Sequence, residues 1–148
     1  MKILLCGDIN SGKTTLIQRL LADMSAAPRG YITVRMPEVD GVSNVYLYDI
    51  ANPPERVEDA AVIMAISNNG TEKHPERLDT LGVRYLTDIP AGSVVVLDEI
   101  GSLETASPEF QKAVMRILSG DYTVLAAVKA ANTDFLRAVR RHPDCELY

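Results

Sequence analysis

Runs of apolar residues recur along the chain with two different spacings, and these predict strands and helices in alternation. A short continuous apolar run bounded by turn residues is typical of a strand, whereas apolar residues three and four positions apart indicate a helix. The predicted strands cover residues 2–6, Tyr31–Met36, Ser43–Asp49, Ala60–Ile66, Val94–Leu97, Tyr122–Val128 and Cys145–Tyr148. The predicted helices cover roughly 13–24, Pro75–Leu86, Ser107 to about Leu118, and Asn132 to about Arg141.

The connections between these segments indicate how the sheet is built. Asp40-Gly41 lies between two β-rich runs and is a hairpin signal. The runs Val94–Leu97 and Tyr122–Val128 are apolar almost throughout, as in parallel strands that are buried on both faces. The chain therefore predicts a three-layer α/β fold in a single domain over residues 1–148, with a mostly parallel sheet and a β-hairpin at one edge.

The segment from Gly7 to Thr14 links the first predicted strand to the first predicted helix. It fits G-x-x-x-x-G-K-[ST], the pattern of phosphate-binding loops, and strand–loop–helix is the context that this pattern needs. Lys13 would reach the β- and γ-phosphates, the Thr14 hydroxyl would bind Mg²⁺, and Thr15 would serve the α-phosphate or local packing. The loop residues whose backbone would surround the phosphates are Gly7, Asp8, Ile9, Asn10, Ser11 and Gly12.

Two carboxylates follow the apolar run Val94–Leu97 directly: Asp98 and Glu99. Because parallel sheets bind ligands at the carboxyl ends of their strands, both are expected near the phosphate loop. Asp98 would bind Mg²⁺ directly or through water, and Glu99 would polarise a water for attack on the γ-phosphate.

The next predicted strand, Tyr122–Val128, indicates a third contribution to this site. In phosphate-loop proteins with a catalytic glutamate, the RecA-like branch, such a strand lies between the phosphate-loop strand and the Asp-Glu strand. The residue at its end here is Lys129. Lys129 would face the γ-phosphate as a sensor, unless it is simply a solvated lysine at a strand end.

Composition and charge narrow the class of protein. The chain has 148 residues, 47% of them hydrophobic and 24% charged, which is the balance of a globular protein. A net charge of −5 disfavours a general nucleic-acid binder. No apolar stretch suggests a signal peptide or membrane span, and two cysteines make neither a disulfide framework nor a metal pattern. We expect a cytoplasmic monomer whose partner is a nucleotide, with no nucleic acid and no membrane.

The segment Asp98–Phe110, D-E-I-G-S-L-E-T-A-S-P-E-F, resembles the signature D-E-I-G-K-M-E-L-x-S-x-x-F. That signature belongs to the small nucleoside-triphosphatases first named from thermophiles. The phosphate loop and first helix are similar to those of the same family, and Gly30–Arg35 resembles its G-F-x-T-x-E-x-R stretch. The resemblance implies a Mg²⁺-dependent enzyme that hydrolyses ATP, GTP and other nucleoside triphosphates to diphosphates. Ser102 and Thr105 depart from the signature, which leaves base recognition open.

Two other functions share the same loop. A kinase would need an acceptor pocket and an arginine-rich lid, for which Arg56, Arg77 and Arg84 are the only candidates. A nucleotide-dependent switch protein would bind nucleotide with little turnover, but the D-x-x-G and N-K-x-D motifs of signalling GTPases are absent.

Two further charged residues have open roles. Arg35 could act as an arginine finger or be an exposed strand residue. Glu104 is expected to order the loop that follows the Asp98-Glu99 strand.

Overall fold

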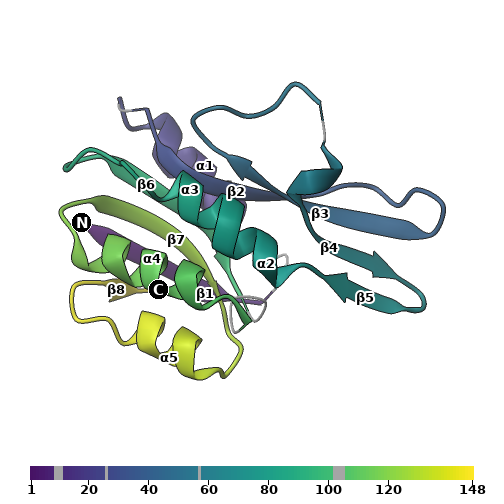
Figure 1. Cartoon of the computed structure of the whole chain (residues 1–148). Coiled ribbons are helices and arrows are strands. Elements are labelled where there is room, and N and C mark those ends of the chain that lie inside the picture. The colour runs from purple at the N-terminus through teal and green to yellow at the C-terminus, as the bar shows by residue number, and fades with distance from the viewer. Residues whose placement is uncertain (9–11, 26, 57, 102–105) are drawn as a thin grey trace.

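An eight-stranded sheet organises the described part of the chain in this computed structural model (Figure 1). The structure describes residues 1–8, 12–25, 27–56, 58–101 and 106–148. The strands are β1 (Lys2–Gly7), β2 (Arg29–Arg35), β3 (Val42–Asp49), β4 (Val62–Ser67), β5 (Gly70–Lys73), β6 (Val94–Ile100), β7 (Thr123–Lys129) and β8 (Glu146–Leu147). The helices are α1 (Lys13–Ala22), η1 (Asp59–Ala61), α2 (Pro75–Arg77), η2 (Leu78–Gly82), α3 (Val83–Tyr85), α4 (Pro108–Ser119) and α5 (Asp134–Arg140). Every strand and helix predicted from the sequence is present, with ends shifted by a few residues.

The strands next to the phosphate-loop motif are all parallel. β1 pairs with β7 on one side and with the short β8 on the other, β7 pairs with β6, and β6 pairs with β2. We call these five strands, in the order β2-β6-β7-β1-β8, the parallel half. β7 lies between β1 and β6, which confirms the predicted strand order. The carboxyl ends of β1, β6 and β7 therefore meet at one edge of the sheet.

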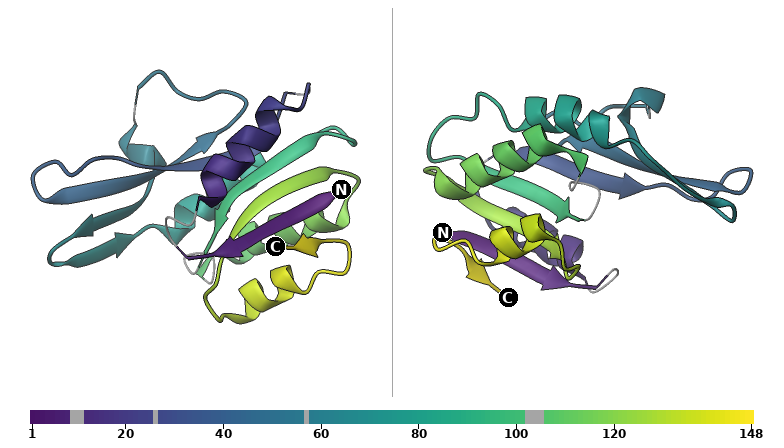
Figure 2. Two further views of the ribbon diagram at one scale, coloured as in Figure 1. Left: turned by 180° about the vertical axis from the view of Figure 1, so that it is seen from behind. Right: turned by 60° about the horizontal axis from the view of Figure 1, so that its bottom comes forward.

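Helices cover both faces of the parallel half and complete the predicted three layers (Figures 1 and 2). On one face, Ile17 of α1 packs in an apolar cluster with Val96 of β6. On the other face, Phe110 of α4 and Leu136 of α5 pack in a larger cluster with Leu97. Because successive residues of β6 contribute to opposite clusters, the strand is buried on both faces.

The other three strands, β3, β4 and β5, form an antiparallel extension of the sheet. β2 and β3 make the predicted hairpin, whose turn residues Asp40 and Gly41 have φ angles of 51° and 79°. Two left-handed residues in succession are what a type I′ hairpin turn requires. The sheet continues into β4 and then β5, a strand that the sequence pattern did not predict. The extension projects past the helices at the right of Figure 1.

The strands β2 and β6 approach each other closely at Gly30. This residue pairs with Val96 and has a φ of 104°. A Cβ atom at Gly30 would lie 2.1 Å from the Val96 carbonyl oxygen, so only glycine fits without a shift of the backbone. Gly30 therefore allows β2 to lie directly beside the strand that carries Asp98 and Glu99.

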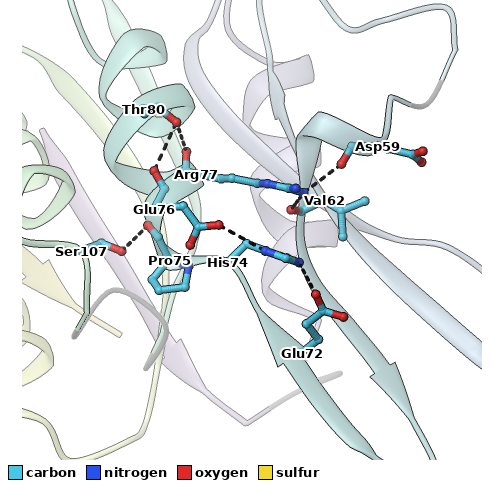
Figure 3. A network of polar contacts seen from close by, with 9 residues as sticks. All are labelled: Asp59, Val62, Glu72, His74, Pro75, Glu76, Arg77, Thr80 and Ser107. Atoms are coloured by element: carbon cyan, nitrogen blue, oxygen red, sulfur yellow. Dashed lines mark hydrogen bonds and ion pairs between the residues drawn. The ribbon is translucent and has the colours of Figure 1, made fainter.

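Polar contacts tie the antiparallel extension to the helical segment that follows it (Figure 3). Nη1 of Arg77, on α2, donates hydrogen bonds to the carbonyl oxygens of Asp59 and Val62. Asp59 lies in η1 and Val62 begins β4. The Arg77 guanidinium therefore joins α2 to the start of β4 in the antiparallel extension. The helical segment also contains a π-type turn, η2, of a kind that inserts an extra residue into a helix.

The start of α4 is held by residues from the same helical segment. Ser107 precedes α4 as predicted, but its hydroxyl donates to the Pro75 carbonyl oxygen at 2.7 Å (Figure 3). The Phe110 backbone N–H of the first turn is bound by the Asp79 carboxylate at 3.0 Å. A residue distant in sequence thus satisfies an N–H group that a cap normally binds.

Helix α5 begins at Asp134, two residues after the start predicted at Asn132. Oγ1 of Thr133 accepts the Leu136 N–H at 3.2 Å and caps the helix. The Oδ1 atom of Asn132 accepts a hydrogen bond from Arg137 Nη1 at 2.7 Å. Across the described residues, no helix combines the length and apolar character that crossing a membrane requires.

Candidate functional site

The predicted phosphate loop lies at the carboxyl end of β1. β1 ends at Gly7 and α1 begins at Lys13, which follows Gly12 in the left-handed region with a φ of 84°. The Lys13 ammonium donates to the carbonyl oxygens of Gly7 at 2.8 Å and Asp8 at 2.7 Å, so its side chain reaches back to the end of β1. Thr15 follows on α1 and is exposed. The predicted loop residues Ile9, Asn10 and Ser11 lie outside the described residues.

The carboxylate of Asp98 faces the first turn of α1. Oδ1 accepts a hydrogen bond from the Thr14 hydroxyl at 3.1 Å, across 84 positions of sequence. Asp98 is only 3% exposed, and this burial raises the pKa of its carboxyl group, while hydrogen bonds from Thr14 and Thr33 act in the opposite direction. The structure thus brings together the two residues that the sequence assigned to a metal ion.

Glu99 points to a different partner. Its Oε1 lies 3.0 Å from Nζ of Lys129, the last residue of β7. Strand alternation alone would put these side chains on opposite faces, because Leu97 shares the α4 face and Ala127 the α1 face. A register shift between Leu97 and Ile100 and a positive φ of 74° at Glu99 change its direction. The bulge therefore turns Glu99 toward Lys129, while Asp98 faces Thr14.

The bulge is anchored from the adjacent strand β2 by two hydroxyl groups. The Tyr31 hydroxyl donates to the Glu99 carbonyl oxygen at 3.3 Å, and the Thr33 hydroxyl donates to that of Asp98 at 3.4 Å. Neither residue was predicted from the sequence to belong to the site. The sequence feature that could have identified them is their alternate spacing on β2. Once β2 is known to lie beside β6, alternate residues near its end are expected to face the end of β6.

A second anchor comes from α5. Nη1 of Arg140 donates to the carbonyl oxygens of Lys129 at 3.0 Å and Ala131 at 2.9 Å. The basic end of α5 could be interpreted from sequence only as favourable charge at a helix C-terminus. Arg140 instead fixes the backbone where β7 ends, and with it the root of the Lys129 side chain.

The edge formed by these residues has the donors that a phosphate group and a hard cation need. Lys13 and Lys129 supply ammonium groups, and the oxygens of Thr14 and Asp98 lie 3.1 Å apart. Mg²⁺ prefers oxygen ligands and in nucleotide sites takes one or two from the protein and the rest from phosphates and water. A cation at Asp98 would also offset the effect of burial on its pKa. The residues present therefore fit Mg²⁺.

Among the described contacts, Arg35 is not joined to this cluster. Arg35 is exposed at the end of β2, where its Nε donates to Oγ of the buried Ser43 at 3.1 Å. Glu104 lies outside the described residues. His74 lies 3.2 Å from the carboxylates of Glu72 and Glu76, in the contacts drawn in Figure 3.

The amino-acid sequence of the chain is similar to those of known nucleoside-triphosphatases. A family model described as NTPase matches residues 2–148. The nucleoside-triphosphatase THEP1 of Thermotoga sp. (strain RQ2) is 26% identical over 160 aligned positions, which cover all of this chain and 85% of that protein. The nucleoside-triphosphatase THEP1 of Thermofilum pendens is 37% identical over 78 residues, which cover 51% of this chain and 43% of the relative.

Solved structures show the same fold. The crystal structure of THEP1 from Aquifex aeolicus superimposes with a TM-score of 0.72 at 19% identity, covering 99% of this chain and 88% of that one. The solution structure of a human cancer-related nucleoside triphosphatase gives a TM-score of 0.66 at 21% identity, covering 99% and 87%. With a family model that spans the chain from residue 2 to its last residue, the chain belongs to the NTPase family of nucleoside-triphosphatases.

Proposed function

We propose that the chain hydrolyses nucleoside triphosphates such as ATP and GTP to diphosphate and phosphate, with Mg²⁺ as cofactor and Glu99 as the group that activates water. The observation that carries the proposal is that Asp98 and Glu99, neighbours in the sequence, have different surroundings and different partners. One carboxylate is buried against Thr14, and the other is 42% exposed beside Lys129. Two neighbouring carboxylates in different environments can perform two different tasks.

The loop residues would bind the triphosphate. Backbone N–H groups of Gly7–Gly12 would surround the phosphate oxygens, and Lys13 would exchange its bonds to loop carbonyls for bonds to the β- and γ-phosphates. Thr14 and Asp98 would hold Mg²⁺, which when bound neutralises charge on the β- and γ-phosphates. Thr15 would contact the α-phosphate.

Glu99 would act on the attacking water. Its exposed carboxylate would accept a proton from the water as the water oxygen bonds to the γ-phosphorus. The bond from the γ-phosphorus to the bridging oxygen breaks, and the diphosphate leaves with that electron pair. Lys129 would face the γ-phosphate and stabilise the charge on its oxygens.

A kinase with a small acceptor is the main alternative, and its support is weaker after the fold is known. Arg77, one of the three arginines that could form a lid, is bound to the carbonyl oxygens of Asp59 and Val62. It serves as a bridge within the protein in this position.

The test is release of inorganic phosphate from a panel of nucleoside triphosphates, with and without Mg²⁺, by the wild-type chain and Lys13→Ala. We expect Mg²⁺-dependent release that Lys13→Ala reduces by about 100-fold or more. A parallel screen of small metabolites measures phosphate transfer to acceptors other than water. Transfer that exceeds hydrolysis would favour the kinase, and tight binding without turnover would favour a switch protein.

A further inference from the structure

We propose that Lys129 changes partner during the nucleotide cycle: it holds Glu99 before a triphosphate binds and moves to the γ-phosphate afterwards, which frees Glu99 for water. The inference rests on the proposed function, because it concerns regulation of the same site. It assigns Lys129 a role before catalysis as well as during it.

The geometry of the Lys129–Glu99 ion pair allows the Lys129 ammonium to change partner while the rest of the side chain stays in place. Nζ of Lys129 and Oε1 of Glu99 are 3.0 Å apart, and their side chains are 27% and 42% exposed, so a ligand can reach both. The root of Lys129 is held more firmly. Its carbonyl oxygen is bound by Arg140, and a Cβ at Gly101 would lie 3.0 Å from its Cδ, so its stem lies against that glycine.

The charges determine which partner Lys129 prefers. A carboxylate carries one negative charge spread over two oxygens, whereas a γ-phosphate carries more charge on three oxygens. The ammonium should therefore leave Glu99 when a γ-phosphate is within reach. A diphosphate has no such group, so the ion pair should persist and keep one Glu99 oxygen away from water. The base would become available only with a complete substrate.

Binding measurements on a double-mutant cycle test this exchange without relying on turnover. The ligands are a non-hydrolysable triphosphate analogue and the matching diphosphate, each with Mg²⁺, titrated against wild type, Lys129→Gln, Glu99→Gln and the double variant. We expect Lys129→Gln to weaken triphosphate binding about tenfold and diphosphate binding less than about twofold. Glu99→Gln should strengthen triphosphate binding about fivefold, because Lys129 no longer has to leave a carboxylate.

The decisive comparison is the effect of Glu99→Gln in the two backgrounds. If Lys129 exchanges partners, the gain from Glu99→Gln disappears in the Lys129→Gln background. An equal gain in both backgrounds would overturn the proposal, because it would reflect only reduced repulsion between Glu99 and phosphate. Equal losses of triphosphate and diphosphate affinity in Lys129→Gln would also overturn it.

A matched pair on the surface of α4 provides the control. Lys112 and Glu109 lie 3.2 Å apart, with side chains 73% and 61% exposed. The same cycle with Lys112→Gln and Glu109→Gln should leave the affinity for both nucleotides unchanged. Thermal unfolding confirms that each variant is folded. If the wild type hydrolyses triphosphates but the effects of Lys129→Gln and Glu99→Gln on binding are additive, the exchange is refuted and the proposed function stands. If the wild type hydrolyses no triphosphate, the proposed function itself is refuted.

Discussion

The parallel half and the antiparallel extension of one sheet are stabilised in different ways. In β6 and β7 nearly every residue is buried, and the side chains pack under helices on both faces. In β5 all four residues are exposed. The inner strands of the extension contribute Leu47 and Ile63 to the large apolar cluster, and a second, small cluster surrounds Tyr46, Ala61 and Val62. Polar contacts such as those of Arg77 tie the extension to the adjacent helical segment.

This difference explains where the candidate site lies. A site that needs two carboxylates and a lysine in fixed positions requires rigid supports. The strands β1, β6 and β7 supply them, and hydroxyl groups from β2 and a guanidinium from α5 fix the local backbone. The extension supports β2 through its pairing with β3. Among the described contacts, no side chain of the extension reaches the sheet edge where Asp98, Glu99 and Lys129 lie. Changes in the parallel half should therefore affect both stability and activity, and changes in the extension mainly stability.

The largest loss of stability is expected from Gly30→Ala, where β2 and β6 approach each other within the parallel half. The added Cβ would lie 2.1 Å from the Val96 carbonyl oxygen and would require a φ of 104°. Together the clash and the backbone strain should lower the free energy of unfolding by at least about 3 kcal/mol, measured by urea denaturation. Gly41→Ala is the control, because it has a φ of 79° and no atom within 4 Å of the added Cβ. We expect it to cost about 1 kcal/mol, and equal losses in the two variants would contradict the close approach of β2 and β6.

A smaller loss of stability is expected from Arg77→Ala, where the helical segment meets the antiparallel extension. Removal of the guanidinium leaves the carbonyl oxygens of Asp59 and Val62 without these hydrogen bonds and should cost about 1–2 kcal/mol. Phosphate release measured well below the unfolding temperature should change less than about twofold, because the residue lies outside the site. Arg116→Ala, an exposed arginine on α4, should change stability by less than about 0.5 kcal/mol. A large loss of turnover in folded Arg77→Ala would mean that the extension contributes to the site.

The smallest effect is a dependence of stability on pH at Asp98. Burial raises the pKa of this carboxyl group above its unfolded value, so the folded state favours the neutral form. The stability linked to that form is present below the unfolded pKa and is lost as pH rises through the folded pKa. In metal-free protein, Asp98→Asn should therefore be more stable than wild type at neutral pH, and the difference should shrink as the solution is acidified. Urea denaturation in a chelator from neutral to acidic pH measures this, and a difference that grows on acidification would contradict the direction of the shift.

Much of the parallel half could be predicted from the sequence, because its strands and turns follow from short runs of residues or from a regular spacing of apolar residues. Continuous apolar runs identified β6 and β7, and the chain order of the motifs predicted that β7 lies between β1 and β6. The hairpin was predicted from Asp40-Gly41 because only a few residues accept left-handed backbone angles. The resemblance to the nucleoside-triphosphatases is confirmed by the family model, which matches residues 2–148.

The features that were not predicted depend on contacts between distant residues. β5 has no apolar pattern, since it is an exposed edge strand of glycine, threonine, glutamate and lysine. The bulge at Glu99 depends on its register with β7, and the hydroxyl contacts of Tyr31 and Thr33 depend on the neighbouring strand. The roles assigned to Lys13, Thr14, Asp98, Glu99 and Lys129 remain predictions, although the structure brings Thr14 to Asp98 and Lys129 to Glu99.

The central claim is that Glu99 activates the attacking water, and Glu99→Gln tests it most directly. The substitution keeps the size of the side chain and removes its ability to accept a proton. We predict that Mg²⁺-dependent phosphate release falls by about 100- to 1,000-fold, while the affinity for a non-hydrolysable triphosphate analogue is kept or increased. Turnover within a few-fold of wild type in a variant that is folded and binds nucleotide would contradict the claim.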